Sequence, residues 1–129
     1  MKHSKTNVNF KDKRGEIRDI LTHSNVDGIT IITCTKGAVR GNHYHKKTVQ
    51  YDYVISGRML CVSKRMPGGK TTKKVLTAGD LAFHPANEAH AFKALVPTVF
   101  LSLTKGPRRG SHFESDTVRL QKPLILPTR

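Results

Sequence analysis

The sequence predicts an all-β fold with a single domain, built as an antiparallel sandwich or barrel. Short runs rich in Val, Ile, Thr, Tyr and Phe recur along the chain, and turn residues end each of them. No segment shows a 3.6-residue apolar period over two or more turns, which argues against long helices. The length of 129 residues suits one hydrophobic core, so we expect one domain over residues 1–129.

Each expected strand follows from one of these runs. In chain order they are GEIRDIL (15–21), GITIITCTK (28–36), VQYDYVIS (49–56), MLCVSKR (59–65), KKVLT (73–77), LAFHP (81–85), HAFKAL (90–95) and TVFLSLTK (98–105). Glycine- or proline-containing turns separate them. We therefore place the barrel core at about residues 14–105. The proline-punctuated tail, residues 106–129, is expected to be a C-terminal extension.

Composition and charge narrow the function classes. The chain is 36% hydrophobic and 25% charged, as in soluble globular proteins, and carries a formal net charge of +14. No apolar run reaches the ~20 residues that span a bilayer, and the first residues do not form a signal peptide. We therefore expect no membrane partner and a cytoplasmic location. Since RNP-type aromatic motifs and zinc-finger spacings are absent, nucleic-acid binding is not favoured, and the charge better suits an anionic small substrate or solubility.

The two cysteines do not suggest a redox or zinc site. Cys34 and Cys61 lie inside apolar strand-like runs, and no CxxC or Cys/His zinc spacing occurs. Both are therefore expected to be buried free thiols.

Two histidines in the stretch RGNHYH are the centre of the predicted site. Residues i and i+2 of a strand share a face, so His43 and His45 project together. If the chain turns after them, Gln50 joins them from the next strand, and His90 comes from a later one. Nitrogen and oxygen donors converging inside a barrel suit a borderline divalent metal such as zinc, nickel or iron(II).

These residues also fall into a spacing that resembles the two cupin motifs. The first runs from Gly37 through the two histidines and Gln50 to Gly57, and the second comprises Gly79, Pro85 and His90. The resemblance implies a single-domain cupin, a double-stranded β-helix or jelly-roll barrel with the site inside. It also implies metal ligation by His43, His45, Gln50 and His90. Three positions depart from the cupin pattern, with Gln50 for the usual Glu, Asn87 for a Gly and Ala94 for an Asn.

Within this superfamily the chain resembles the RmlC-like sugar-nucleotide cupins, which include epimerases, ketoisomerases and capsule-sugar enzymes. The segments FKDKRGEIRDIL, RGNHYHKK and FESDTVRL carry the likeness. In the ketoisomerases the paired histidines are thought to move protons without metal, and Gln50 is compatible with that group too. Arg40 matches an arginine that contacts substrate in the epimerases. Their tyrosine acid lies later in the chain, and no tyrosine follows Tyr53 here.

Two further residues are expected near the substrate. Asp52 lies two residues after Gln50, so strand alternation turns it toward the pocket, where a carboxylate can act as general base for enolisation. A salt bridge to a basic neighbour is the alternative role. His84, before Pro85, is expected with Arg40 among the substrate-binding groups or at the rim.

The predicted function is that of a metal-binding cupin isomerase or epimerase acting on a carbonyl-bearing sugar or sugar nucleotide. A divalent ion (Zn, Ni, Fe or Mn) at the four ligands polarises the carbonyl, and His43, His45 or Asp52 moves a proton. The alternatives are a non-catalytic metal- or sugar-binding module and a metal-dependent dioxygenase. The expected partners are an anionic sugar substrate and a second copy of the chain in a homodimer, as in many relatives.

Overall fold

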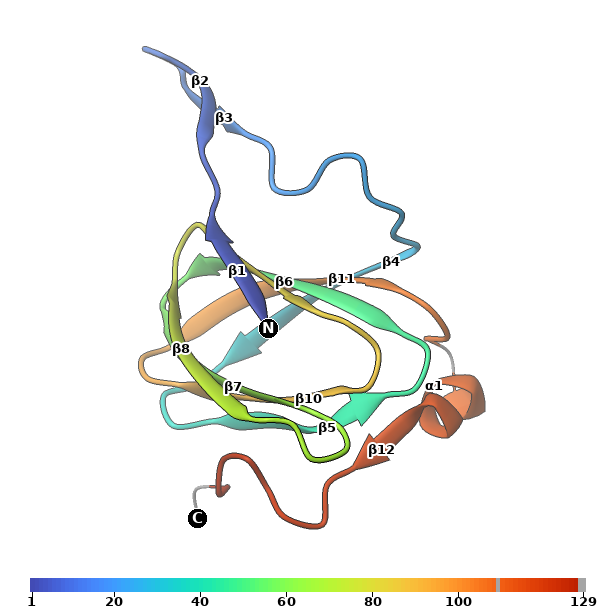
Figure 1. Ribbon diagram of the computed structural model, residues 1–129. Coiled ribbons are helices and arrows are strands. Elements are labelled where there is room, and N and C mark those ends of the chain that lie inside the picture. The colour runs from blue at the N-terminus through green and yellow to red at the C-terminus, as the bar shows by residue number, and fades with distance from the viewer. Residues whose placement is uncertain (109, 128–129) are drawn as a thin grey trace.

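A computed structural model describes residues 1–108 and 110–127 and shows two five-stranded antiparallel sheets that face each other (Figure 1). Their strand orders are β1-β9-β6-β11-β4 and β12-β5-β10-β7-β8. The elements are β1 (Lys2–Lys5), β2 (Val8–Asp12), β3 (Gly15–Arg18), β4 (Gly28–Cys34), β5 (Val39–His45), β6 (Val49–Ser56), β7 (Arg58–Arg65), β8 (Thr71–Thr77), β9 (Asp80–His84), β10 (Glu88–Ala94), β11 (Thr98–Lys105), α1 (Gly110–Asp116) and β12 (Thr117–Arg119). The predicted all-β fold is confirmed.

The sheets extend beyond the predicted barrel core of residues 14–105 at both ends. Strand β1 pairs with β9, and β12 pairs with β5. Neither strand has the apolar alternation that identifies a strand in the sequence, because all four residues of β1 are exposed and β12 has three residues. Helix α1 was not predicted either, since Asp116 is its only buried residue among those described and it has no apolar stripe.

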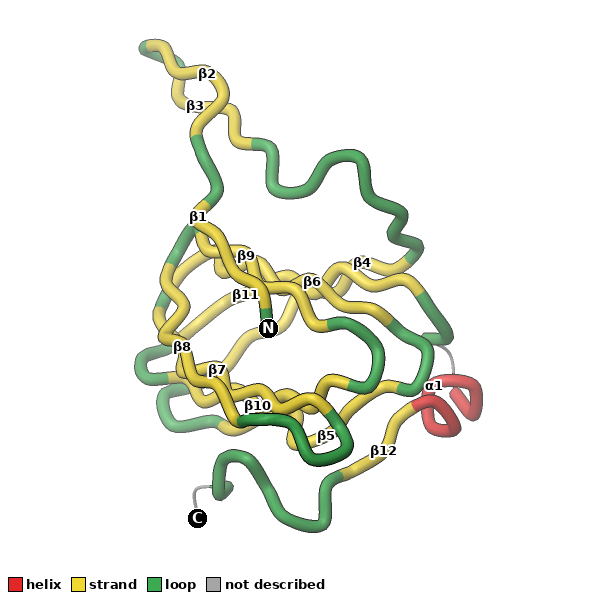
Figure 2. Tube along the Cα trace, in the orientation of Figure 1, coloured by secondary structure: helices red, strands yellow, loops and turns green. Residues whose placement is uncertain are grey.

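A hairpin of β2 and β3 projects beyond the barrel, as the trace in Figure 2 shows. Its apolar side chains Phe10 and Ile17 are 52% and 61% exposed.

The predicted homodimer stays a prediction. No helix in the described part of the chain has the length and apolar character needed to cross a membrane.

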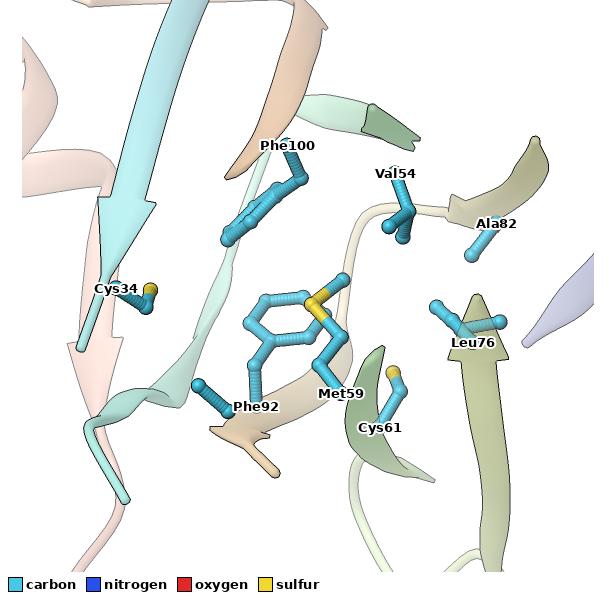
Figure 3. Packing of buried hydrophobic residues seen from close by; sticks show 9 residues of the cluster. Cys34, Val54, Met59, Cys61, Leu76, Ala82, Phe92 and Phe100 are labelled. Carbon is cyan, nitrogen blue, oxygen red and sulfur yellow. The ribbon is translucent and has the colours of Figure 1, made fainter. Parts of the chain in front are cut away.

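The hydrophobic core fills one end of the space between the two sheets (Figure 3). The ring of Phe100 on β11 packs against that of Phe92 on β10, with 5.5 Å between the ring centroids, so the two rings bridge the sheets. Both cysteines are buried and free, as predicted. The alternation that buries these side chains also turns polar residues of the same strands inward at the other end, where the site lies.

Candidate functional site

A bulge in strand β5 sets the direction of the first histidine. Gly41 and Asn42 both have positive φ, 88° and 59°, and the register between β5 and β10 shifts at His90/Ala91. A Cβ on Gly41 would come within 2.7 Å of the His90 carbonyl oxygen, so glycine permits the close approach of the two strands. The bulge places His43 directly opposite His90. Asn42 uses its side chain to bind Leu124 and Ile125 of the C-terminal extension.

Three imidazoles converge inside the barrel. The ring centroid of His43 lies 4.9 Å from that of His45 and 4.9 Å from that of His90. One potential ligand nitrogen from each of the three residues lies within 4.8 Å of the others. The Nδ1 atoms of His43 and His90 are buried without a hydrogen-bond partner among the described residues. Buried polar atoms are rarely left so, and this arrangement suits a bound cation or substrate group.

These histidines form one wall of a cavity of about 220 Å³. The other lining residues are Ile32, Arg40, Gly41, Gln50, Phe92, Phe100, Ser102, Arg108 and Phe113. The cavity therefore combines aromatic surface with two arginines and a row of nitrogen and oxygen donors. Such a combination is typical of sites that hold a polar ligand with an anionic group.

The structure brings together five of the seven predicted site residues. His43, His45, Gln50, His90 and Arg40 all line the cavity. Two of the donor groups of Arg40 are already engaged: Nε contacts the Cys34 sulfur at 3.2 Å and Nη2 donates to the Thr33 carbonyl at 3.0 Å.

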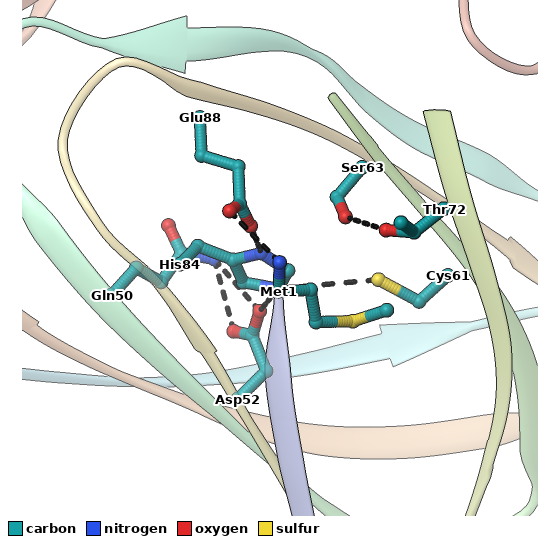
Figure 4. A network of polar contacts seen from close by, with 8 residues as sticks. All are labelled: Met1, Gln50, Asp52, Cys61, Ser63, Thr72, His84 and Glu88. Atoms are coloured by element: carbon teal, nitrogen blue, oxygen red, sulfur yellow. Dashed lines mark hydrogen bonds and ion pairs between the residues drawn. The ribbon is translucent and has the colours of Figure 1, made fainter. Parts of the chain in front are cut away.

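The other two, Asp52 and His84, face the barrel interior but do not line the cavity. They form a buried network behind Gln50, shown in Figure 4. Nε2 of His84 lies 3.3 Å from Asp52 Oδ2, and Nδ1 of the same ring lies 3.2 Å from Glu88 Oε1. The amino group of Met1 contacts the other oxygen of Glu88 at 2.9 Å. His84 therefore bridges two carboxylates, and its predicted contact with substrate stays a prediction.

Three residues of the C-terminal segment complete the site, and none of them has a role predicted from the sequence. Arg108 stacks on Phe113, and both line the cavity. Asp116 accepts hydrogen bonds from the backbone N–H of Lys47 (2.7 Å) and the hydroxyl of Thr48 (2.6 Å), and its Oδ2 lies 3.7 Å from His45 Nδ1. Asp116 thus fixes the turn after β5 and stands behind His45. In the sequence, Asp116 is marked only by its place in the segment FESDTVRL, which carries part of the family resemblance.

Burial sets the charge state of the cavity histidines. Burial, reinforced by the neighbouring His45, lowers the pKa of His43 to about 4. Burial also lowers the pKa of His45, and it lowers the pKa of His90 well below the ordinary value. These rings are therefore neutral at pH 7 and have lone pairs to offer. Burial alone would lower the pKa of His84 too, but hydrogen bonds to Asp52, Cys61 and Glu88 raise it well above 6.5.

The lowered pKa of His43 predicts an acid-sensitive fold. Between its folded pKa of about 4 and its unfolded value of 6.5, the unfolded chain binds a proton that the folded chain does not. The stability from this residue is therefore complete above 6.5 and is lost as pH falls toward 4. It amounts to at most about 3 kcal/mol. Urea unfolding of EDTA-treated protein at several pH values measures it. A His43→Gln variant should show a shallower pH dependence, and an unchanged slope would contradict the assignment.

Comparison with known proteins identifies the family to which the chain belongs. The family model for the polysaccharide biosynthesis C-terminal domain matches residues 10–93. No curated protein sequence matches the chain. Many solved structures do match it.

Among these, the dTDP-4-dehydrorhamnose 3,5-epimerase from Sulfolobus tokodaii is 25% identical, with a TM-score of 0.71, over 84% of this chain and 70% of that one. The rmlC epimerase of Mycobacterium tuberculosis is 17% identical, with a TM-score of 0.78, over 92% and 67%. QdtA, a sugar 3,4-ketoisomerase from Thermoanaerobacterium thermosaccharolyticum solved with TDP, is 20% identical, with a TM-score of 0.75, over 93% and 88%. The predicted cupin jelly roll of the RmlC type is confirmed, and the chain belongs to the polysaccharide biosynthesis C-terminal domain family.

Proposed function

We propose that this chain is a sugar epimerase or isomerase that moves a proton at a carbon beside the carbonyl of a sugar nucleotide. The observation that carries the proposal is the convergence of three neutral imidazoles and Gln50 on one wall of a cavity that Arg40 and Arg108 also line. The neighbours in fold support the substrate class, since their descriptions name dTDP-sugar epimerases and a ketoisomerase.

The arginines account for the anionic part of such a substrate. A guanidinium group binds phosphate oxygens in a bidentate manner, and Arg108 is held by its stacking on Phe113, with 4.9 Å between the guanidinium carbon and the ring centroid. The net charge of +14 favours the approach of an anionic ligand at low ionic strength.

His45 is the residue best placed to act as the base. A general base needs a free lone pair and a fixed orientation. Asp116 and the hydroxyl of Thr117, 3.3 Å from His45 Nδ1, hold one side of the ring. His45 also lines the cavity, where the side chain of Gln50 is its hydrogen-bonding neighbour. Removal of a proton from the carbon beside the carbonyl leaves an enolate, whose charge the arginines stabilise. Delivery of a proton to the opposite face of the same carbon, by a group other than His45, inverts that carbon. Return of the proton to the former carbonyl carbon, with transfer of the adjacent hydroxyl proton to the former carbonyl oxygen, moves the carbonyl.

Proton exchange with solvent tests this function without knowledge of the product. The protein is incubated in deuterium oxide with dTDP-linked and UDP-linked 4-keto sugars. Deuterium should enter at the carbons beside the carbonyl, as detected by mass spectrometry and NMR. Absence of exchange with every sugar in the panel would contradict the proposal.

We also propose that His43, His45, Gln50 and His90 can hold a divalent cation such as zinc, nickel, iron or manganese. The donor set fits, because three imidazole nitrogens converge within 4.8 Å and two Nδ1 atoms have no partner among the described residues. A bound cation would polarise a substrate carbonyl. A ring nitrogen that binds a cation cannot also accept a proton, so metal content decides whether His45 is a ligand or the base.

Metal analysis is therefore a direct test of the second proposal. If the four residues hold a cation, the purified protein should carry close to one equivalent of metal by mass spectrometric elemental analysis. His90→Ala should lower the content by at least about tenfold, since one ligand in four is lost. His3→Ala, an exposed histidine on β1, is the matched control and should leave the content unchanged. Metal-free wild-type protein after growth and purification with added zinc would contradict ligation.

A further inference from the structure

Asp52 and Gln50 meet in an arrangement that fixes the direction of an amide. The side-chain nitrogen Nε2 of Gln50 lies 2.9 Å from one carboxylate oxygen of Asp52 and 3.0 Å from the other. Asp52 is fully buried and Gln50 is 7% exposed. An ionised carboxylate only accepts hydrogen bonds, so the NH₂ end of Gln50 must face Asp52 and its carbonyl oxygen must point away.

We propose that Asp52 is a positioning residue that makes Gln50 a hydrogen-bond acceptor in the cavity. This inference rests on the proposed function in its metal-free form. It assigns to the carbonyl oxygen of Gln50 a hydrogen-bond donor, the sugar hydroxyl beside the substrate carbonyl. A reversed amide would present its NH₂ group and would instead suit a carbonyl or phosphate oxygen. The direction of this one amide therefore selects which part of the substrate lies against β6.

His84 holds Asp52 in turn. Its two ring nitrogens face Asp52 and Glu88 at 3.3 and 3.2 Å, and both partners are acceptors (Figure 4). Both nitrogens must donate to satisfy them. The three residues come from β6, β9 and the start of β10, so the network joins the two sheets directly behind the site. Gln50 and His84 are themselves paired across β6 and β9.

Replacement of Asp52 by asparagine should reverse the amide. The introduced side chain would have one acceptor oxygen for two donors, Gln50 and His84. Its NH₂ group would favour a Gln50 whose carbonyl oxygen turns back toward it. We expect kcat/KM for the exchanging keto sugar to fall about 10–100-fold, as for other residues that orient a ligand from behind.

A double-variant cycle separates this role from proton transfer by Asp52 itself. If Asp52 acts through Gln50, Asp52→Asn should cause no further loss in a Gln50→Leu background. If Asp52 is the general base, the same fold loss should appear in both backgrounds, and the positioning role is overturned. Asp80→Asn, at a partly buried aspartate that begins β9, is the matched control and should leave kcat/KM unchanged.

NMR of the protein without substrate tests the amide when no sugar is turned over. The Gln50 side-chain NH₂ signals, identified by their loss in Gln50→Leu, should be shifted by the carboxylate and protected from solvent exchange. Asp52→Asn should remove both properties, whereas Asp80→Asn should not. Gln50 signals that exchange freely in the wild type would overturn the positioning role. Protected signals with no turnover of any keto sugar would uphold it while refuting the proposed function.

Discussion

Replacing His45 with alanine is expected to lower the rate of deuterium exchange into a keto sugar nucleotide by about 10²–10⁴-fold, the usual contribution of a general base. His45 is 3% exposed, lines the cavity, and is backed by Asp116 with 3.7 Å between the nearest atoms. Its lowered pKa leaves it neutral and able to accept a proton at pH 7. Single-turnover exchange at saturating substrate measures the chemical step without binding effects.

Two companion variants sharpen this experiment. Asp116→Asn keeps the imidazole but removes the negative charge behind it, so we expect a loss smaller than that of His45→Ala. Tyr44→Phe alters the residue between the two histidines, which lines a different hollow on the outer side of the sheet, and exchange should be unchanged. Exchange by His45→Ala within threefold of the wild type would assign the proton transfer to another residue.

Strand alternation and motif spacing predicted the ring of donors, because both depend on local rules. His43 and His45 lie two residues apart on one strand, and Gln50 follows a short turn, so their shared direction follows from the period of two. Alternation also predicted correctly that Asp52 faces the barrel interior. Alternation indicates which face of the sheet a residue lies on, but not whether its side chain reaches the cavity. Gln50 lines the cavity, and Asp52 lies behind it.

The C-terminal contribution could not be predicted in the same way. Asp116 reaches Thr48 across 68 residues of chain, and it does so from a seven-residue helix without an apolar stripe. Arg108 and Phe113 belong to the same segment and line the cavity, and β12, which follows them in the chain, pairs with β5. Such contacts depend on tertiary packing, which leaves no periodic signal in the sequence.

Replacing His84 with alanine is expected to lower the free energy of unfolding by about 3–5 kcal/mol, the usual cost of removing one partner from a buried ion pair. His84 is 1% exposed and lies between Asp52 and Glu88. After its removal, among the described side chains and termini, Asp52 keeps the amide of Gln50 and Glu88 keeps the Met1 amino group as partners. Urea unfolding of EDTA-treated protein at pH 6 measures the loss. His90→Ala is the matched control, because this second buried histidine contacts no carboxylate among the described residues and should cost less.

The pH dependence distinguishes a lost charge from a lost volume. The folded-state pKa of His84 is raised, so its contribution to stability is complete below 6.5 and is lost as pH rises through the higher folded value. The pKa of Glu88 is lowered despite its burial, through His84 and the Met1 amino group, so its contribution is lost as pH falls below about 4.5. The stability gap between wild type and His84→Ala should therefore be widest between about pH 4.5 and 6.5 and should narrow on both sides. A stability gap that stays constant with pH, or that equals the gap for His90→Ala, would mean that His84 acts only by filling space. Either result would contradict a stabilising charged network behind Gln50.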